Sequence, residues 1–266
     1  MRSRPSPYLH TTSLWEFPSA NYGEGPFGSS RQGNPDYPGA TPSHVIWNLL
    51  ARYTRPKDLV VDPMCGGGTT LDVCRDLGRR AKGFDLQPQR RDVTEADART
   101  LPLADGEADF VFVDPPYSTH LSWSKKPECL GEANAFDADP ERGFFAGLQQ
   151  VVEEIDRVLG MDRYAAIYIG DSSDVEQSSG DGAEGSTRSF AAIGYHTFRM
   201  LQERFTPVDE IAVVRHHRGL QHGRQRSAAA ENNFILRGYH HLYVVAKGEP
   251  GDRRDPAEVE AMPIAY

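Results

Sequence analysis

The stretch "DLVVDPMCGGGTTLDVCRDLG", residues 58–78, constrains the fold most, because it joins a short apolar strand to a helix through a glycine turn. In α/β folds a turn of this kind, followed by a free helix N-terminus, is where nucleotides bind. Gly66, Gly67 and Gly68 allow a ligand to approach the backbone closely. The turn is neither the G-x-G-x-x-G dinucleotide pattern nor a phosphate-binding loop with a following lysine. It therefore favours a nucleoside ligand without a polyphosphate.

The rest of the chain alternates apolar strand patterns with helical periodicity. Ser43 is positioned to cap a helix over 43–54, and Gly78 to end the helix that follows the glycine turn. Helices are also expected within 140–160 and 188–205, and strands at 81–86, 92–98, 108–114, 163–171, 208–216 and 239–247. This order predicts an α/β fold with a mainly parallel sheet and an antiparallel last strand.

Composition divides the chain into three parts. Residues 1–42 are rich in Pro, Gly and Ser with little periodicity, so we expect an N-terminal arm without regular structure. The main domain spans 43–248, with a flexible loop at 171–187 and a basic loop at 215–233. Residues 249–266 form a C-terminal tail.

Charge and cysteine content exclude several classes of protein. The net charge of −9 argues weakly against nucleic acid as a partner, although arginines cluster locally between residues 215 and 226. No apolar run is long enough for a membrane span or a signal peptide, so a cytoplasmic protein with no membrane partner is expected. Three scattered cysteines predict neither a disulfide framework nor a metal site, and the histidines near residue 217 lack further ligands, so no metal is expected.

Two acids follow successive strands after the glycine turn. Asp85 ends the next strand, where a carboxylate would accept hydrogen bonds from the two hydroxyls of a ribose. Asp97 follows the strand after that, where it would meet an adenine amino group.

Residues 37–70, "YPGATPSHVIWNLLARYTRPKDLVVDPMCGGGTT", resemble the helix, strand and glycine turn of amino-group DNA methyltransferases. The resemblance extends over roughly residues 37–248, includes a late strand that reads "HLYVVAK", and implies a Rossmann-like methyltransferase fold. It implies S-adenosylmethionine as cofactor, with Met64 in place of the usual phenylalanine. The residues that it assigns to cofactor binding are Asp62, Pro63, Met64, Cys65, Gly66, Gly68, Thr69, Asp85 and Asp97.

The same family carries a catalytic motif that is matched here by "DPPY", Asp114, Pro115, Pro116 and Tyr117, directly after an apolar strand. An aromatic amine is a poor nucleophile, because its lone pair is delocalised into the ring. The carboxylate of Asp114 and the carbonyl of Pro115 would accept its two hydrogens and so localise the lone pair. Prolines hold this carbonyl in place, and Tyr117 would stack on the base.

The amine of a paired base must leave the duplex before it can react, which costs a few kcal/mol, and stacking at about 1–3 kcal/mol per base offsets this cost. Candidate nucleic-acid contacts are Trp123, Arg215, Arg218, Arg224 and Arg226. The predicted partner is double-stranded DNA. Because no target-recognition domain of the usual size is found in the sequence, a homodimer and a separate specificity subunit are both compatible with this prediction.

Asp at the first motif position favours adenine N6. The alternatives are methylation of cytosine N4 in DNA, methylation of guanine N2 or adenine N6 in RNA, and a catalytically silent nucleic-acid-binding subunit.

Overall fold

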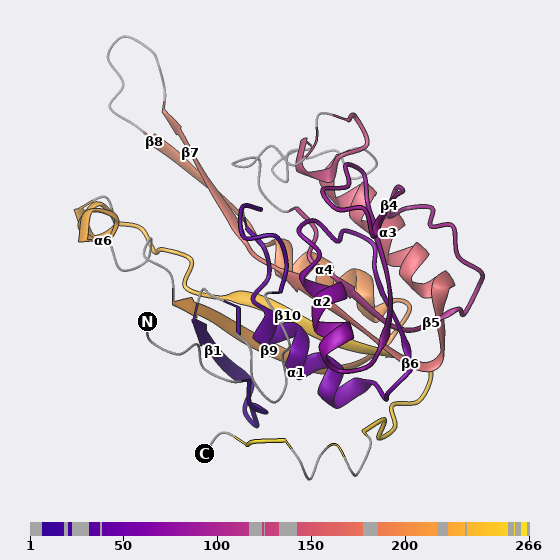
Figure 1. Ribbon diagram of the computed structural model, residues 1–266. Helices are drawn as coiled ribbons and strands as arrows, with labels where there is room; N and C mark the ends of the chain where they lie inside the picture. Colours follow the sequence, from indigo (N-terminus) through magenta and orange to yellow (C-terminus); the bar gives the residue numbers. More distant parts are fainter. Residues whose placement is uncertain are drawn as a thin grey trace.

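The computed structural model describes residues 7–18, 21–22, 32–37, 39–116, 124, 126–132, 143–177, 186–216, 223–231, 233–254, 258 and 262–264. Its centre is an eight-stranded sheet in the order β1-β9-β10-β6-β5-β2-β3-β4 (Figure 1). The strands are β1 (Leu14–Pro18), β2 (Leu59–Asp62), β3 (Arg80–Asp85), β4 (Val93–Glu95), β5 (Ala108–Val113), β6 (Leu159–Ile169), β9 (Thr206–His216) and β10 (His240–Lys247). The helices are α1 (Ser43–Tyr53), α2 (Thr69–Asp76), α3 (Phe144–Val158), α4 (Ile193–Gln202) and α6 (Gly223–Glu231), with a 3-10 turn η1 at Leu130–Glu132.

Strand β10 is antiparallel to both of its neighbours, β6 and β9, and every other pairing in this sheet is parallel. The expected α/β architecture with an antiparallel last strand is therefore confirmed. Strands β2 and β5 are almost wholly buried because the sheet is covered on both faces. Val111 and Val113 of β5 belong to one buried cluster, and Phe110 and Phe112 belong to the other.

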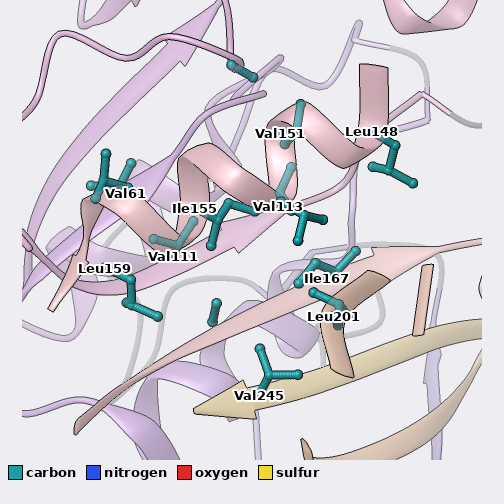
Figure 2. Close-up of a cluster of buried hydrophobic side chains, with 14 of the residues drawn as sticks. Val61, Val111, Val113, Leu148, Val151, Ile155, Leu159, Ile167, Leu201 and Val245 are labelled. Atoms are coloured by element: carbon teal, nitrogen blue, oxygen red, sulfur yellow. The ribbon is translucent and has the colours of Figure 1, made fainter. Parts of the chain in front are cut away.

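The two clusters hold the covering helices in place. Leu148, Val151 and Ile155 of α3 lie at helical spacing and face the strands from one side (Figure 2). On the other face, α1 packs with the aromatic side chains of Trp15 and Phe17. Because the parallel strands run in one direction, the ends of β2, β3 and β5 bring their following residues to one edge of the sheet.

The N-terminal arm contains regular structure, which the sequence analysis did not expect. Strand β1 pairs with β9 from Leu14↔Ala212 to Pro18↔His216 and extends the sheet. The alternation of Trp15 and Phe17, both buried, is too short to stand out from a Pro- and Gly-rich background.

Both ends of the loop expected at 171–187 are instead strands, and residues 178–185 lie outside the described residues. Strands β7 (Ser172–Gln177) and β8 (Ser186–Ala191) pair antiparallel and project from the body (Figure 1). A two-stranded ribbon is held by backbone hydrogen bonds, so a polar composition does not exclude it. For the same reason the helix expected over 188–205 begins only at Ile193.

Two further local expectations were wrong. The segment 215–233 is not a continuous loop, because it includes α6, whose run of alanines favours a helix. Ser43 begins α1 without capping it: its Oγ accepts a hydrogen bond from the Tyr22 N–H at 3.0 Å. Within the described part of the chain, no helix is both long and apolar enough to cross a bilayer.

Candidate active site

A single cavity opens at the carboxyl edge of the sheet and brings together residues from the glycine turn, from the ends of β3 and β5, and from the N-terminal arm. The space open to the centre of a water molecule is about 170 Å³. One bound water needs only about 10–15 Å³ by this measure, so the cavity has room for a larger ligand. Twelve of the predicted residues line it: Asp62, Pro63, Met64, Cys65, Gly66, Thr69, Asp85, Asp97, Asp114, Pro115, Pro116 and Arg215.

The glycine turn has the backbone that the sequence predicted. Gly66 and Gly68 have φ values of 46° and 78°, in the left-handed region that favours glycine, and Thr69 begins α2. Gly68 does not line the cavity, but a Cβ there would lie 2.5 Å from the Arg90 guanidinium. Arg90 in turn donates to the Gly68 carbonyl at 3.1 Å and to the carboxylate of Asp72. A side chain at Gly68 would therefore displace Arg90.

Asp85 is tied to this turn. Its Oδ2 accepts the Gly66 N–H at 2.9 Å, and its Oδ1 accepts the Gln87 N–H at 2.8 Å. Each carboxylate oxygen keeps a lone pair for a ligand in the cavity. The role of Asp85 in holding a ribose stays a prediction.

Asp62 lies at the base of the cavity, almost fully buried. Its Oδ2 accepts the Thr70 hydroxyl at 2.5 Å, and its Oδ1 accepts the Met64 N–H at 3.1 Å. Burial raises the pKa of Asp62 to about 7, against the lowering effect of these two donors. A positively charged ligand group would favour its ionised form.

Asp97 is already engaged by a neighbour. The Arg99 guanidinium donates to both of its oxygens, with the shortest contact at 2.6 Å. Burial opposes ionisation, but the hydrogen bonds from Arg99 lower the pKa of Asp97 overall. Arg99 also lines the cavity and was not identified from the sequence.

Asp114 follows β5 directly and lies across the cavity from the glycine turn. Burial raises its pKa to about 7, against the lowering effects of the Thr41 hydroxyl and the Arg215 charge. The Thr41 hydroxyl donates to Oδ2 of Asp114. Pro115 and Pro116 follow without N–H groups, so neither offers a donor that would compete for this carboxylate.

The N-terminal arm covers the glycine turn. Its Asn34 N–H donates to the Gly67 carbonyl at 2.8 Å, and its Gly33 N–H donates to Asp72 at 2.7 Å. The Tyr37 ring lies so close to Gly66 that a Cβ there would be 2.7 Å from it. Burial, followed by the charges of Asp85, Asp114 and Asp62, raises the pKa of the Tyr37 phenol. The sequence analysis did not select Tyr37 or Thr41 for the site, because both contacts join residues far apart in the chain.

The candidate nucleic-acid residues are placed less completely. Tyr117, Trp123 and Arg218 lie outside the described residues, and for Arg224 the backbone alone is described, in α6. Arg226 is exposed on α6. Arg215 differs from the expectation of a basic loop: it lies in β9, lines the cavity and donates to the Ala40 carbonyl at 3.0 Å.

The three cysteines are buried and form no disulfide. Burial raises the pKa of the Cys65 thiol well above its usual value, so Cys65 is a wall of the cavity and not a nucleophile. Among the described residues, no group of three His, Cys, Asp or Glu side chains could hold a metal ion.

Comparison with known proteins gives a family match for the first part of the chain. Residues 5–96 match the family model N6_N4_Mtase, described as DNA methylase. This range includes the glycine turn and Asp85 and ends before Asp114. No curated protein matches the sequence.

Solved structures that are similar to this chain include a methyltransferase from Methanosarcina mazei that is S-adenosylmethionine-dependent, with 13% identity over 74% of this chain and 95% of that one and a TM-score of 0.45. A second is the 1,6-didemethyltoxoflavin-N1-methyltransferase of Burkholderia thailandensis, with 15% identity over 78% and 76% and a TM-score of 0.43. A third is the Haloferax volcanii complex of the Trm112 activator with a putative methyltransferase, with 18% identity over 75% and 87% and a TM-score of 0.42.

Proposed function

We propose that this chain, a member of the N6/N4 DNA methylase family by the match over residues 5–96, transfers a methyl group to the exocyclic amine of a base in double-stranded DNA, namely N6 of adenine. The methyltransferase fold and the S-adenosylmethionine cofactor follow from the family. The DNA substrate, the choice of adenine and the roles of individual residues are the proposal. One observation carries it: Asp114 and the glycine turn with Asp85 open into the same cavity.

The cavity suits this cofactor in charge. Its acids outnumber its arginines, Arg99 and Arg215, among the residues that line it; the acids are Asp62, Asp85, Asp97, Asp114 and Glu128. An excess of negative charge complements the sulfonium and ammonium groups of S-adenosylmethionine. When bound, the cofactor supplies an electrophilic methyl group.

The residues that would hold the cofactor follow from the contacts described above. Asp85 has acceptor capacity for the ribose hydroxyls, and it also keeps the glycine turn in place through the Gly66 N–H. Asp62, at the base of the cavity, would pair with the ammonium group. The left-handed Gly66 keeps that wall of the cavity free of a side chain.

The chemistry of transfer falls to the residues after β5. The Asp114 carboxylate and the Pro115 carbonyl accept the two hydrogens of the target amine, which directs the nitrogen lone pair towards the methyl group. After transfer the amine carries an extra proton, and the ionised Asp114, which already accepts one of its hydrogens, would take this proton. No cysteine nucleophile is needed in a direct transfer.

The test is methyl transfer with labelled S-adenosylmethionine to unmethylated genomic DNA and, in parallel, to total RNA, followed by nucleoside digestion and mass spectrometry. The expected product is N6-methyladenine in DNA. N4-methylcytosine in DNA would overturn the choice of base, and label confined to RNA would overturn the substrate. Bound cofactor without transfer to either would overturn the proposed activity in favour of a silent subunit.

A further inference from the structure

The carboxylate of Asp114 is held from outside its own motif. Thr41 is 73 residues away in the sequence, in the segment that leads from the arm into α1. Its hydroxyl donates to Oδ2 of Asp114, and the Thr41 residue is only 5% exposed. Within the described part of the chain, no hydrogen bond is found to the other oxygen, Oδ1.

Thr41 is itself fixed on both sides. Pro42 follows it with φ −59° and ψ 132°, and a residue before proline is restricted to extended conformations. On the other side, the guanidinium of Arg215 donates to the carbonyl of Ala40 at 3.0 Å. Strand β9 thereby fixes the segment that presents the Thr41 hydroxyl.

Arg215 contributes charge as well as a tether. Its guanidinium is close enough to Asp114 to favour the ionised carboxylate, although the two form no ion pair within 4.0 Å among the described contacts. Its Nε is buried, with no hydrogen-bond partner in the described residues. Two further groups face Asp114: the Tyr37 phenol from the arm and the Asp62 carboxylate from the end of β2.

We propose that Thr41 is a positioning residue for the transfer. Its hydroxyl occupies Oδ2 of Asp114 and leaves Oδ1 directed to the amine of the target base. Arg215 holds Thr41 in place through the Ala40 carbonyl. This inference rests on the proposed function. A carboxylate with two equivalent free oxygens would rotate about its terminal torsion, which is broad and roughly two-fold. A fixed donor on one oxygen removes that freedom before the substrate arrives.

The test uses Thr41→Val, which keeps the shape and removes the hydroxyl, and Thr41→Ser, which keeps the hydroxyl. The first measurement needs no substrate: the Asp114 carboxyl is titrated by carbon-13 NMR and assigned with Asp114→Asn. The Thr41 hydroxyl favours the charged form of the Asp114 carboxyl, so T41V is expected to raise the pKa of Asp114. T41S is expected to leave this pKa near its value in the unsubstituted protein. An unchanged titration in T41V overturns the inference, whether or not the protein methylates DNA.

The second measurement is single-turnover methyl transfer to unmethylated genomic DNA across pH. For T41V we expect a transfer rate about 10- to 100-fold lower. Its rise in activity is expected at higher pH, because Asp114 must be ionised. T41S is expected to keep the rate and the pH profile of the unsubstituted protein. Affinity for S-adenosylmethionine and the midpoint of thermal unfolding serve as controls for folding and are expected to change little. The inference is overturned if T41V has the same rate and pH profile as the unsubstituted protein. If the unsubstituted protein is inactive but the NMR titration is as expected, the proposed function alone is overturned.

Discussion

The backbone N–H of Gly66 donates to Oδ2 of Asp85 at 2.9 Å, and this hydrogen bond joins the glycine turn to the side chain at the end of β3. This bond fixes the carboxylate on the wall of the cavity, where it faces the same space as Asp114. The sequence placed both residues at strand ends, and the structure shows that they belong to one cavity.

Replacement of Asp85 by alanine is expected to lower the affinity for S-adenosylmethionine by about 10- to 100-fold, because the ribose loses its acceptor and the turn loses its tether. Isothermal titration calorimetry measures this directly. The matched control is Asp105→Ala, an acid whose side chain is 83% exposed and lies outside the cavity lining. Affinities that agree within about threefold between D85A and D105A would contradict the assignment.

Gly68→Ala is expected to destabilise the fold more than Gly78→Ala. Both glycines have left-handed backbones, with φ of 78° and 68°, so alanine carries a similar conformational cost of about 1–2 kcal/mol at each. Only at Gly68 would the new Cβ meet the Arg90 side chain, at 2.5 Å, and disturb its contacts with Asp72. Chemical denaturation of the two variants measures the difference, and equal losses of stability would show that the Arg90 contact is unimportant.

Stability is expected to depend on pH through Asp62 and Asp114. Burial raises the pKa of each to about 7, while an unfolded chain releases these protons near pH 4. Between about pH 4 and 7 the folded chain therefore binds more protons, and these two groups make the free energy of unfolding fall as the pH rises.

Asp114→Asn removes one of these groups. We expect this variant to exceed the full chain in stability by about 1–3 kcal/mol near pH 8 and to differ little near pH 4. Denaturant titrations at the two pH values test this, with Asp105→Asn as the exposed control. If Asp114→Asn is no more stable than the unsubstituted protein near pH 8, the ionised Asp114 does not destabilise the fold.

Arg226 and Arg215 are expected to act differently, although both come from the same basic stretch of sequence. Arg226 is exposed on α6, and its replacement by alanine is expected to weaken DNA binding and to reduce the salt dependence of log K by about 1. Arg215 lines the cavity, so R215A is expected to lower the transfer rate with little change in that slope. Fluorescence anisotropy of DNA binding at several salt concentrations separates the two effects. Equal slopes of log K against salt for R226A and the unsubstituted protein would show that Arg226 does not contact DNA.

The elements with strong local signals could be predicted from the sequence. The conformation of apolar runs such as Ala108–Val113 and of the turn at Gly66 to Gly68 depends mainly on local sequence. The parallel core was therefore predicted correctly, and most of the residues assigned to the cofactor line the cavity. The strand β1 and the β7–β8 hairpin were missed, because short or polar strands depend on pairing with distant backbone. Thr41 was missed for a similar reason: only the fold brings it to Asp114, and neither residue type alone indicates the contact.

The central claim is that the Asp114 carboxylate carries out the transfer in a cavity that binds the cofactor independently of it. Single-turnover methyl transfer by Asp114→Ala, with S-adenosylmethionine affinity measured on the same sample, tests this most directly. We expect a rate at least about 100-fold below that of the unsubstituted protein, with cofactor affinity changed by less than about tenfold. Transfer by D114A at a near-normal rate would contradict it.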